Sequence, residues 1–167
     1  EDQSEPTNFS VPTGNFGDVY AGYLAKKMGL PINKLLVATN QNDILHRAIS
    51  NGNYEAETVS ETISPSMDIQ IASNFERLIF DLNDKNSEQT SKDMMKIKEE
   101  GKYSIDQEKL NLINQDFLSA RMNETETLDV IKSVYKEFNI VLDPHTAIGY
   151  GAFDKHDLNG NNIVLAT

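Results

Sequence analysis

The sequence predicts an α/β fold of three layers, in which helices cover both faces of a mostly parallel sheet. Short apolar strands alternate with helical patterns over short links, beginning with two strand–helix units in the first third of the chain. A strand that follows such a helix is expected to return parallel to the first strand. The length of 167 residues suits one domain of ordinary size.

The first half of the chain supplies two strands and three helices, each with its own local signal. The strands are short apolar runs, and the first two helices end at Gly29 and Gly52, which terminate helices well. In order, the predicted elements are a strand at 9–11, a turn at 13–18, a helix at 19–28, a strand at 34–39, a helix at 43–51, and a helix from 73 to 82 that opens with the capping box Ser73-x-x-Glu76.

The second half is expected to be mostly helical. Residues 81–127 carry many charges and few strand formers, so they are predicted to form a solvated helical insert, with a capping box at Ser104-x-x-Gln107 and an apolar face that reaches Phe117 and Leu118. The elements that follow are a helix at 127–138 with an apolar stripe facing the core, stopped by Asn139; a strand at 140–142; a helix with Asp143 as N-cap and Pro144 at its first position; and, after Asn159-Gly160, a buried strand at 163–167. The sheet would then consist of the strands that begin near Phe9, Lys34, Ile140 and Ile163, in a chain that is one domain or part of one.

Composition and charge exclude several classes of function. Lys and Arg number 15 against 26 Asp and Glu, so the net charge is −11. A chain of this charge should bind neither nucleic acid nor an anionic membrane. The absence of Cys excludes disulfides, thiolate nucleophiles and cysteine-ligated zinc, and the His residues lack the spacing of metal ligands. Since no apolar run approaches the roughly 20 residues of a membrane span, a soluble, cytoplasmic protein is expected.

The sharpest motif is the turn Pro12-Thr-Gly-Asn-Phe-Gly-Asp18, between a strand and a helix. Two glycines three residues apart let backbone N–H groups converge, and the positive end of the helix adds to them, so the turn can hold a phosphate. It is not a Walker loop, which needs Gly-Lys-Ser/Thr, and its glycine spacing does not fit the dinucleotide motif. From the residues alone, a tight turn in which Asp18 caps the helix explains the pattern equally well.

Five blocks of sequence, in order along the chain, carry a resemblance to one enzyme family. They are residues 9–32, which include the turn, and residues 36–47, 64–69, 72–78 and 143–149. In these blocks the chain resembles threonine synthase, a pyridoxal-phosphate (PLP) enzyme of fold type II. The resemblance implies that residues 1–167 are the phosphate-loop portion of the large, tryptophan-synthase-β-like PLP domain, with a variable helical insert at about 81–127.

The same resemblance implies a cofactor, a reaction and a set of site residues. The complete enzyme would use PLP to convert O-phosphohomoserine and water to threonine and phosphate. The cofactor phosphate would be bound by Gly14, Asn15, Phe16, Gly17 and Asp18, and the hydroxyl of Thr167, in the pair Ala166-Thr167, would face the pyridine nitrogen. Ser64, Asn74 and Arg77 lie in matching blocks and could reach a substrate phosphate or carboxylate, or serve capping and packing; His145 has the same two readings.

One departure from the family concerns the lysine that binds the cofactor covalently. In the family this Schiff-base lysine precedes the phosphate loop, whereas the first lysine here is Lys26, in the helix beyond the loop. Lys26, Lys27 and Lys34 are interpreted as solvated charges, so no residue is assigned a catalytic role. The isolated chain is therefore expected to be inactive and to bind PLP weakly, and a complementing N-terminal segment or second chain would supply the lysine.

Two other classes of function remain open. The chain could be a non-catalytic partner or remnant module that retains a phosphate-binding loop. Thr13-Gly14-Asn15 also resembles the loop with which flavodoxins bind flavin mononucleotide, although Phe16 stands where those proteins have a hydroxyl residue.

Overall fold

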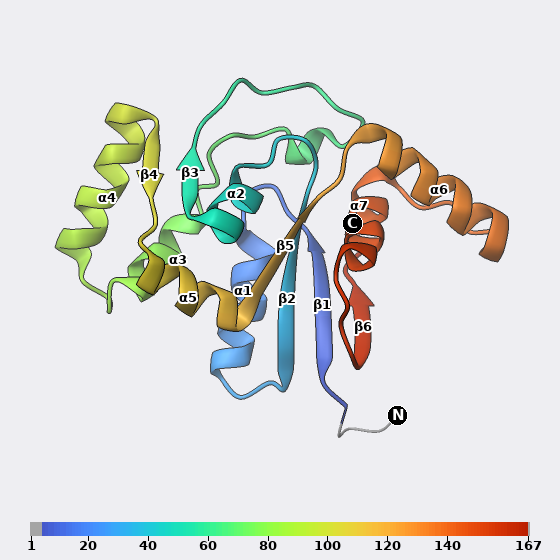
Figure 1. Ribbon diagram of the computed structural model, residues 1–167, viewed down its shortest axis with the longest axis horizontal. Coiled ribbons are helices and arrows are strands. Elements are labelled where there is room, and N and C mark those ends of the chain that lie inside the picture. The colour runs from blue at the N-terminus through green and yellow to red at the C-terminus, as the bar shows by residue number, and fades with distance from the viewer. Residues whose placement is uncertain (1–4, 167) are drawn as a thin grey trace.

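A four-stranded sheet of order β5–β2–β1–β6 runs through the middle of the molecule, and every neighbouring pair in it is parallel (Figure 1). The computed structural model describes residues 5–166. The four strands are β1 (Thr7–Pro12), β2 (Ile32–Thr39), β5 (Phe117–Arg121) and β6 (Asn161–Val164). The predicted parallel pairing of the first two strands is confirmed, with Val11 of β1 opposite Val37 of β2.

Helices cover both faces of this sheet, as the sequence predicts. Leu35 and Val37 of β2 point to one face and Leu36 and Ala38 to the other, each pair into its own apolar cluster. The first cluster is completed by helices α1 (Gly17–Lys27), α2 (Ile44–Asn51), α3 (Phe75–Leu82) and α5 (Gln107–Asp116). The second is completed by α7 (Pro144–Ala152), against which α6 (Glu124–Phe138) packs.

A smaller unit, absent from the sequence predictions, lies beside the first layer of helices. Strands β3 (Asn53–Glu55) and β4 (Lys102–Ser104) pair antiparallel, and α4 (Ser87–Glu100) packs next to them (Figure 1). Tyr54 and Tyr103 are opposite each other in this pair and both are buried. Each strand has only three residues, too few to show an alternating pattern. Two 3₁₀ helices, η1 (Pro65–Met67) and η2 (Phe153–Lys155), complete the described elements.

Three predictions that concern the strands need correction. The helical interpretation of residues 117–118 is wrong, because α5 ends at Asp116 and Phe117 begins strand β5, which pairs with β2 inside the segment predicted as an insert. The strand predicted at 140–142 does not form. Ile140 and Val141 are 55% and 73% exposed, and the place beside β2 that a fourth strand could take belongs to β5. The buried strand predicted at 163–167 is only partly correct, because β6 spans Asn161–Val164 and Ile163 is 44% exposed at the edge of the sheet.

Neither predicted capping box forms. Helix α3 begins after Asn74 with no side-chain cap, since Ser73 instead donates hydrogen bonds to Asn15. Helix α5 is capped by Asp106 in place of Ser104. A capping box does open α6, formed by Asn123 and Glu126. The predicted helix ends at Gly52 and Asn139, both left-handed, and the predicted cap at Asp143 are confirmed.

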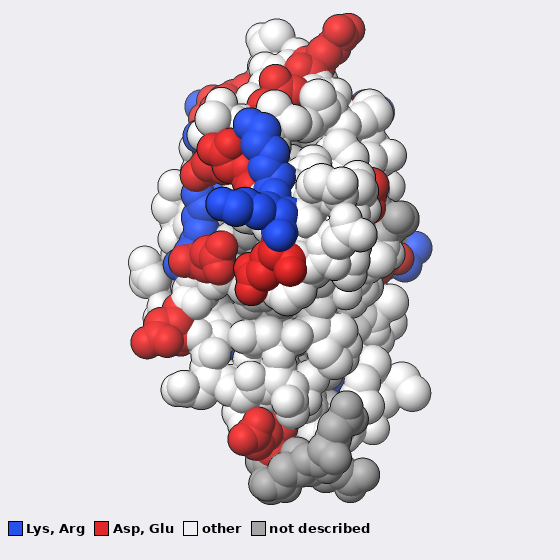
Figure 2. Space-filling model, turned by 90° about the vertical axis from the view of Figure 1, so that its right-hand side faces the viewer, with Lys and Arg blue, Asp and Glu red and all other residues white. Residues whose placement is uncertain are grey.

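Helix α6 leaves most of its apolar stripe in solvent, although the sequence predicts that the stripe faces the core. Val134 is buried, but Leu128, Tyr135 and Phe138 are 44%, 53% and 52% exposed. Only the first part of the helix lies near α7, and the rest projects from the molecule (Figure 1). Figure 2 shows the face of the molecule that lies on the right-hand side in Figure 1. On this face the charged side chains gather in the upper half of the view, and few lie in the lower half.

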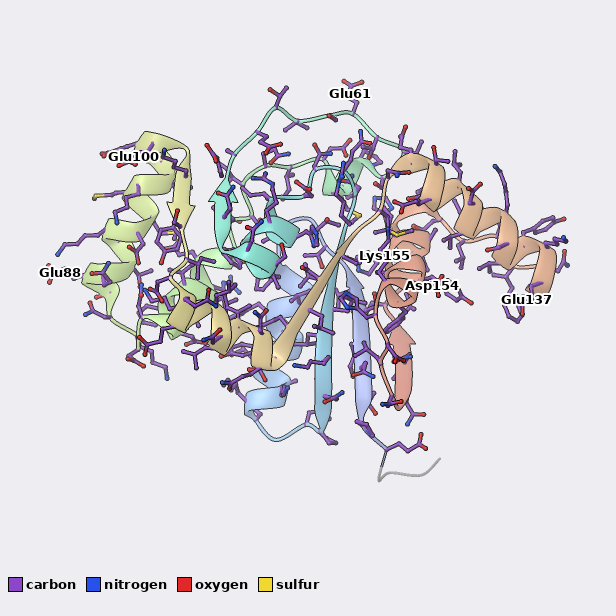
Figure 3. All side chains as sticks on the ribbon, in the orientation of Figure 1. Glu61, Glu88, Glu100, Glu137, Asp154 and Lys155 are labelled. Atoms are coloured by element: carbon purple, nitrogen blue, oxygen red, sulfur yellow. The ribbon has the colours of Figure 1, made fainter. Side chains whose placement is uncertain are left out.

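Several acidic side chains lie at the periphery of the molecule. Glu61, Glu88, Glu100 and Glu137 extend from the long loop and from helix ends at the outer rim of the molecule (Figure 3). Among residues 5–166, no helix combines the length and the apolar character that crossing a membrane requires.

Candidate functional site

The turn after β1 lies at the carboxyl edge of the parallel sheet, where the order of strands reverses. The chain passes from β1 to β2 and β5 on one side and later returns to place β6 on the other side of β1. Ligands of open α/β sheets bind at such a switch point. Numbered by chain order, the four strands read 3-2-1-4, whereas a flavodoxin reads 2-1-3-4-5. The strand order therefore argues against the flavodoxin alternative.

Phe16 holds this turn in its shape. Its backbone is left-handed, with φ of 67°, a conformation that costs a non-glycine residue about 1–3 kcal/mol. Its ring is only 1% exposed and contacts Phe75 edge-on, with a centroid distance of 5.1 Å, and Phe117 at 5.8 Å. Burial of the ring offsets the backbone strain, so the aromatic cluster determines the path of the turn.

The first turn of α1 is left without a side-chain cap. Phe16 occupies the N-cap position, and its side chain has no acceptor for the N–H groups that begin the helix. Asp18 lies inside the first helical turn and is exposed, so the alternative in which Asp18 caps the helix is wrong. The free N–H groups open into a hollow of about 190 Å³, lined by residues 11–19 and by Asn74. Such an arrangement suits an anion.

The two glycines of the turn, Gly14 and Gly17, differ in the space that a side chain would have. A Cβ atom on Gly14 would lie 2.6 Å from the carbonyl oxygen of Ser66, so only glycine permits η1 to approach the turn this closely. A Cβ atom on Gly17 would meet only the side-chain nitrogen of Asn74, at 3.4 Å. Neither glycine has a positive φ, and the left-handed position belongs to Phe16. Glycine here serves close approach and not an unusual backbone angle.

Asn15 ties the turn to the start of α3. Its side-chain oxygen accepts hydrogen bonds from the backbone N–H of Ser73 and from the Ser73 hydroxyl, the latter at 2.9 Å. The N–H of Asn74 donates to the carbonyl of Asn15 at 3.3 Å. This link places the Asn74 side chain at the rim of the hollow. Sequence reasoning singled out Asn74 but missed the link, for which the only signal was the presence of both blocks in one family resemblance.

Ser64 does not reach the hollow. It is 1% exposed and lies in a polar cluster, where its hydroxyl accepts a hydrogen bond from the Asn40 side chain at 2.9 Å. The carboxylate of Asp68 completes the cluster and accepts from Asn40 and Thr62. The structure therefore supports the packing role of Ser64 and not the ligand-binding one.

His145 and the end of β6 do come close to the turn. His145 lines a second hollow of about 530 Å³ together with Gly14, Asp18 and Ser66, and its Nδ1 lies 3.2 Å from Asp143. In β6, Val164 is opposite Ser10 of β1, and the N–H of Leu165 donates to the carbonyl of Ser10. The chain thus leads Ala166 towards the carboxyl edge. Thr167 lies outside the described residues.

The lysines discussed above lie elsewhere. Lys26 pairs with Asp116 at 2.7 Å, and Lys34 donates to the carbonyls of Asn114 and Gln115, at the end of the sheet opposite the turn. Among the residues that line the hollow after β1, none is a lysine. The hollow thus has uncapped N–H groups but no lysine amine among its lining residues.

Comparison with known proteins shows which proteins the chain resembles. No family model matches the sequence. A threonine synthase of Pseudomonas aeruginosa is 47% identical over 144 residues, which are 86% of this chain and 31% of that protein. The crystal structure of PLP-bound threonine synthase from Brucella melitensis is 44% identical, matches 99% of this chain and 36% of its own, and has a TM-score of 0.95. The chain is homologous to one part of threonine synthase.

The match to threonine synthase extends over most of this chain but only part of the enzyme. The chain spans about a third of the length of the curated relatives it matches. The threonine synthase of Saccharomyces cerevisiae shows the same proportions, with 43% identity over 91% of this chain and 32% of that protein. A serine racemase of maize, 14% identical with a TM-score of 0.59, shares the fold alone. The expectation of a fold-type-II architecture is confirmed.

A separate polar hollow, about 480 Å³ in volume, lies along β5. The Nδ1 of His46 is 2.9 Å from the Ser119 hydroxyl, and the Nε2 of His156 is 3.0 Å from the Ser119 carbonyl. Within the described part of the chain, no cluster of three or more His, Asp and Glu residues could hold a metal ion. His46 thus contacts a side chain of the edge strand β5, and His156 contacts one of its main-chain carbonyls.

His46 should make stability depend on pH. Its burial lowers its pKa below the ordinary value of 6.5; Asp43 opposes this shift, and Arg121 adds to it. The folded state therefore binds fewer protons than the unfolded state as the pH falls through about 6.5, and the free energy of unfolding should fall with it until the folded pKa is passed. Urea unfolding at about pH 7.5 and about pH 5.5 measures this, and His46→Gln should reduce the dependence. An equal dependence in both proteins would contradict the prediction.

Proposed function

We propose that this chain is the phosphate-binding part of a PLP-dependent enzyme whose complete form is a threonine synthase, converting O-phosphohomoserine and water to threonine and phosphate. The observation that carries the proposal is the uncapped first turn of α1, held open by the buried Phe16 at the switch point of the sheet. The likeness to a PLP-bound threonine synthase supports the choice of ligand. A cytoplasmic location and a small-molecule substrate belong to the same proposal.

The chain's own residues would hold the cofactor by its phosphate. The N–H groups of residues 14–18 offer hydrogen bonds without a cation, and the positive end of α1 favours a dianion there. Asn74 adds a side-chain amide at the rim. When bound, PLP supplies the electron sink for loss of phosphate from the substrate. We assign the Thr167 hydroxyl to the pyridine nitrogen, which an uncharged partner leaves unprotonated.

On this proposal the isolated chain has no synthase activity and binds PLP weakly. Hydrogen bonds to a charged phosphate are each worth about 1.5–3 kcal/mol, and association costs at least about 4 kcal/mol. Since no lysine lines the hollow, a covalent link does not add to this small surplus. The net charge of −11 also repels an anionic cofactor. A yellow chain whose colour borohydride fixes onto one of its own lysines would contradict this part of the proposal.

A chimera tests the reaction. The corresponding third of the Pseudomonas aeruginosa threonine synthase is replaced by this chain, so that the remainder of that enzyme supplies the missing segments. Incubation with O-phosphohomoserine should release phosphate and form threonine, and PLP absorbance reports independently whether the chimera binds the cofactor. A chimera that binds PLP without releasing phosphate would overturn the assigned reaction and favour a non-catalytic remnant. A chimera that is folded but colourless would overturn the cofactor.

A further inference from the structure

Helix α6 is apolar on two neighbouring faces, and within residues 5–166 only one of them is well covered. On the covered face, Val130 packs against the apolar cluster around α7, and Val134 is buried. The other face, called the outer stripe below, consists of Leu128, Ile131, Tyr135 and Phe138. Three of these side chains are exposed and Ile131 is half-buried. A helix that is apolar over so wide an arc is ordinarily buried on both faces.

The order of residues in the outer stripe suits contact with a second helix. Its four residues follow one another at intervals of three, four and three positions. This spacing places side chains in one line along a helix, where they can interlock with those of a partner helix. Asn139 ends α6, and Ile140 and Val141, which follow, are 55% and 73% exposed. The exposed apolar positions therefore continue beyond the helix.

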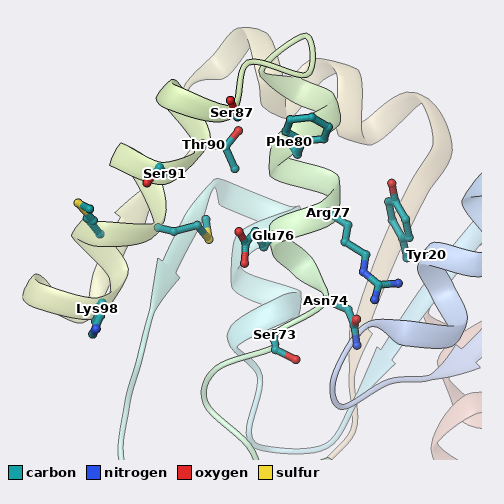
Figure 4. Close-up of a pocket in the computed structure, with 12 residues that line it drawn as sticks. Tyr20, Ser73, Asn74, Glu76, Arg77, Phe80, Ser87, Thr90, Ser91 and Lys98 are labelled. Atoms are coloured by element: carbon teal, nitrogen blue, oxygen red, sulfur yellow. The ribbon is translucent and has the colours of Figure 1, made fainter.

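The exposed Met95 shows how a single apolar side chain differs from this stripe. Met95 is 55% exposed in a groove of about 800 Å³ between α3 and α4, but polar and charged residues, among them Ser87, Ser91 and Lys98, line the same groove (Figure 4). An isolated apolar side chain of this kind is normal on a protein surface, whereas a contiguous apolar patch marks an interaction site.

The similarity to threonine synthase indicates what covers the outer stripe. About two thirds of the Pseudomonas aeruginosa and Saccharomyces cerevisiae enzymes lies outside the segments that match this chain. The Brucella melitensis structure matches 99% of this chain with a TM-score of 0.95, so the arrangement that includes α6 is kept where that further chain is present. A second copy of this chain is a poorer partner, because two chains of charge −11 repel each other.

We propose that the outer stripe, with Ile140 and Val141, is a docking surface for the part of a threonine synthase that lies outside the match, which lays an apolar segment along α6. Helix α6 begins at Glu124, shortly after β5 ends at Arg121, and so starts at the same edge of the sheet as the turn after β1. A docked segment is thereby anchored beside the edge where the proposed function needs a lysine from outside this chain. The identity of the partner rests on the proposed function, but the docking surface itself does not.

Hydroxyl-radical footprinting of the isolated chain and of the chimera described above tests the surface. In the chimera, the rest of the Pseudomonas aeruginosa enzyme is present to cover α6. Tyr135 and Phe138 should be modified in the isolated chain, where they are exposed, and should lose that modification in the chimera. Phe16 is buried within this chain and should stay unmodified in both proteins, so it is the internal reference.

A pair of double variants separates the stripe from the rest of α6. Tyr135→Lys with Phe138→Lys alters the stripe, and Ser133→Lys with Glu137→Gln, at exposed positions on the opposite side of the helix, is the matched control, since each pair raises the net charge by two. In the isolated chain both should keep the urea midpoint within about 0.3 M. Phosphate titration of the ¹⁵N-labelled chain, followed by NMR at the amides of residues 14–18, should give one midpoint for both.

The chimera should tell the two double variants apart. The stripe variant should lower its urea midpoint by about 0.5–1 M and expose Leu128 to modification, whereas the control should do neither. If the chimera fails to fold, a second chimera with the Pseudomonas aeruginosa residues restored over 124–141 should fold, because its docking surface then matches its partner. Failure of both would contradict the proposal.

The outcomes separate this proposal from the proposed function. Tyr135 and Phe138 that stay modified in a chimera that binds PLP and releases phosphate would overturn the docking surface and leave the proposed function standing. Protection in a folded but colourless chimera would support the docking surface and overturn the cofactor. A dimer of the isolated chain in sedimentation, abolished by the stripe variant, would assign the surface to a second copy and overturn the proposed partner.

Discussion

Replacing Phe16 by alanine is expected to lower the free energy of unfolding by about 3–5 kcal/mol. The ring is 1% exposed and contacts Phe75 and Phe117, so its removal leaves a cavity between α1, α3 and β5. The left-handed backbone at this position then loses the burial that offsets its strain. Urea unfolding should show a lower midpoint with an unchanged slope, because the folded state keeps its compactness.

Phe138→Ala is the matched control for this substitution. It removes the same ring from the exposed end of α6, where Phe138 is 52% exposed, and should change the free energy of unfolding by no more than about 0.5 kcal/mol. Equal losses in the two variants would show that Phe16 does not anchor the turn. A Phe16→Ala protein that unfolds normally but no longer shifts the amides of residues 14–18 with phosphate would separate the shape of the turn from global stability.

Gly14→Ala is expected to separate the turn from η1. The new methyl group would lie 2.6 Å from the carbonyl oxygen of Ser66, which is backbone and cannot rotate away. Accommodating it should lower the free energy of unfolding by about 1–3 kcal/mol. The same movement displaces the N–H groups that face the hollow, so the affinity of residues 14–18 for phosphate should fall at least about tenfold.

Gly17→Ala adds the same methyl group three residues further along the turn. There the nearest atom outside the helix is the Asn74 side-chain nitrogen at 3.4 Å, an ordinary contact, and alanine suits the start of a helix. Its unfolding midpoint should match that of the unaltered protein to within about 0.5 kcal/mol. If Gly14→Ala were as stable as Gly17→Ala, the close approach of η1 would not be what requires glycine.

Local signals predicted the part of the fold that local interactions determine. The unit from β1 to β2 has two apolar strands, a helix ending near Gly29 and a parallel pairing, and all of these follow from adjacent residues. The predictions that fail concern segments whose structure depends on partners distant in the chain. The strand β5 reads Phe-Leu-Ser-Ala-Arg, a weak pattern that becomes a strand because β2 lies beside it. Residues 140–142 have a stronger pattern but no strand to pair with.

In the candidate site too, the features set by neighbouring residues could be predicted, and those set by distant residues could not. The glycine-containing turn was visible in the sequence, and the family resemblance named its residues. Its geometry was not visible, because the hydrogen bonds from Ser73 to Asn15 join residues 58 positions apart and because Phe16 is oriented by Phe75 and Phe117. These contacts assign Ser73 to the turn and deny it the capping role that its own neighbours predict. At the turn, a tertiary contact overrides the local preference of Ser73 to cap a helix.

The central place of β1 has a consequence for the order of folding. Its pairing with β2 closes a short loop, whereas its pairing with β6 joins Asn8 to Asn162, which are 154 positions apart. Closing so long a loop costs conformational entropy before the second pairing can stabilise the fold. Because its partners are so far apart in sequence, this pairing should form late. During synthesis, one edge of β1 stays open until residues 161–164 have left the ribosome. The turn after β1 is thus built on a strand that pairs early along one edge, with β2, and late along the other, with β6.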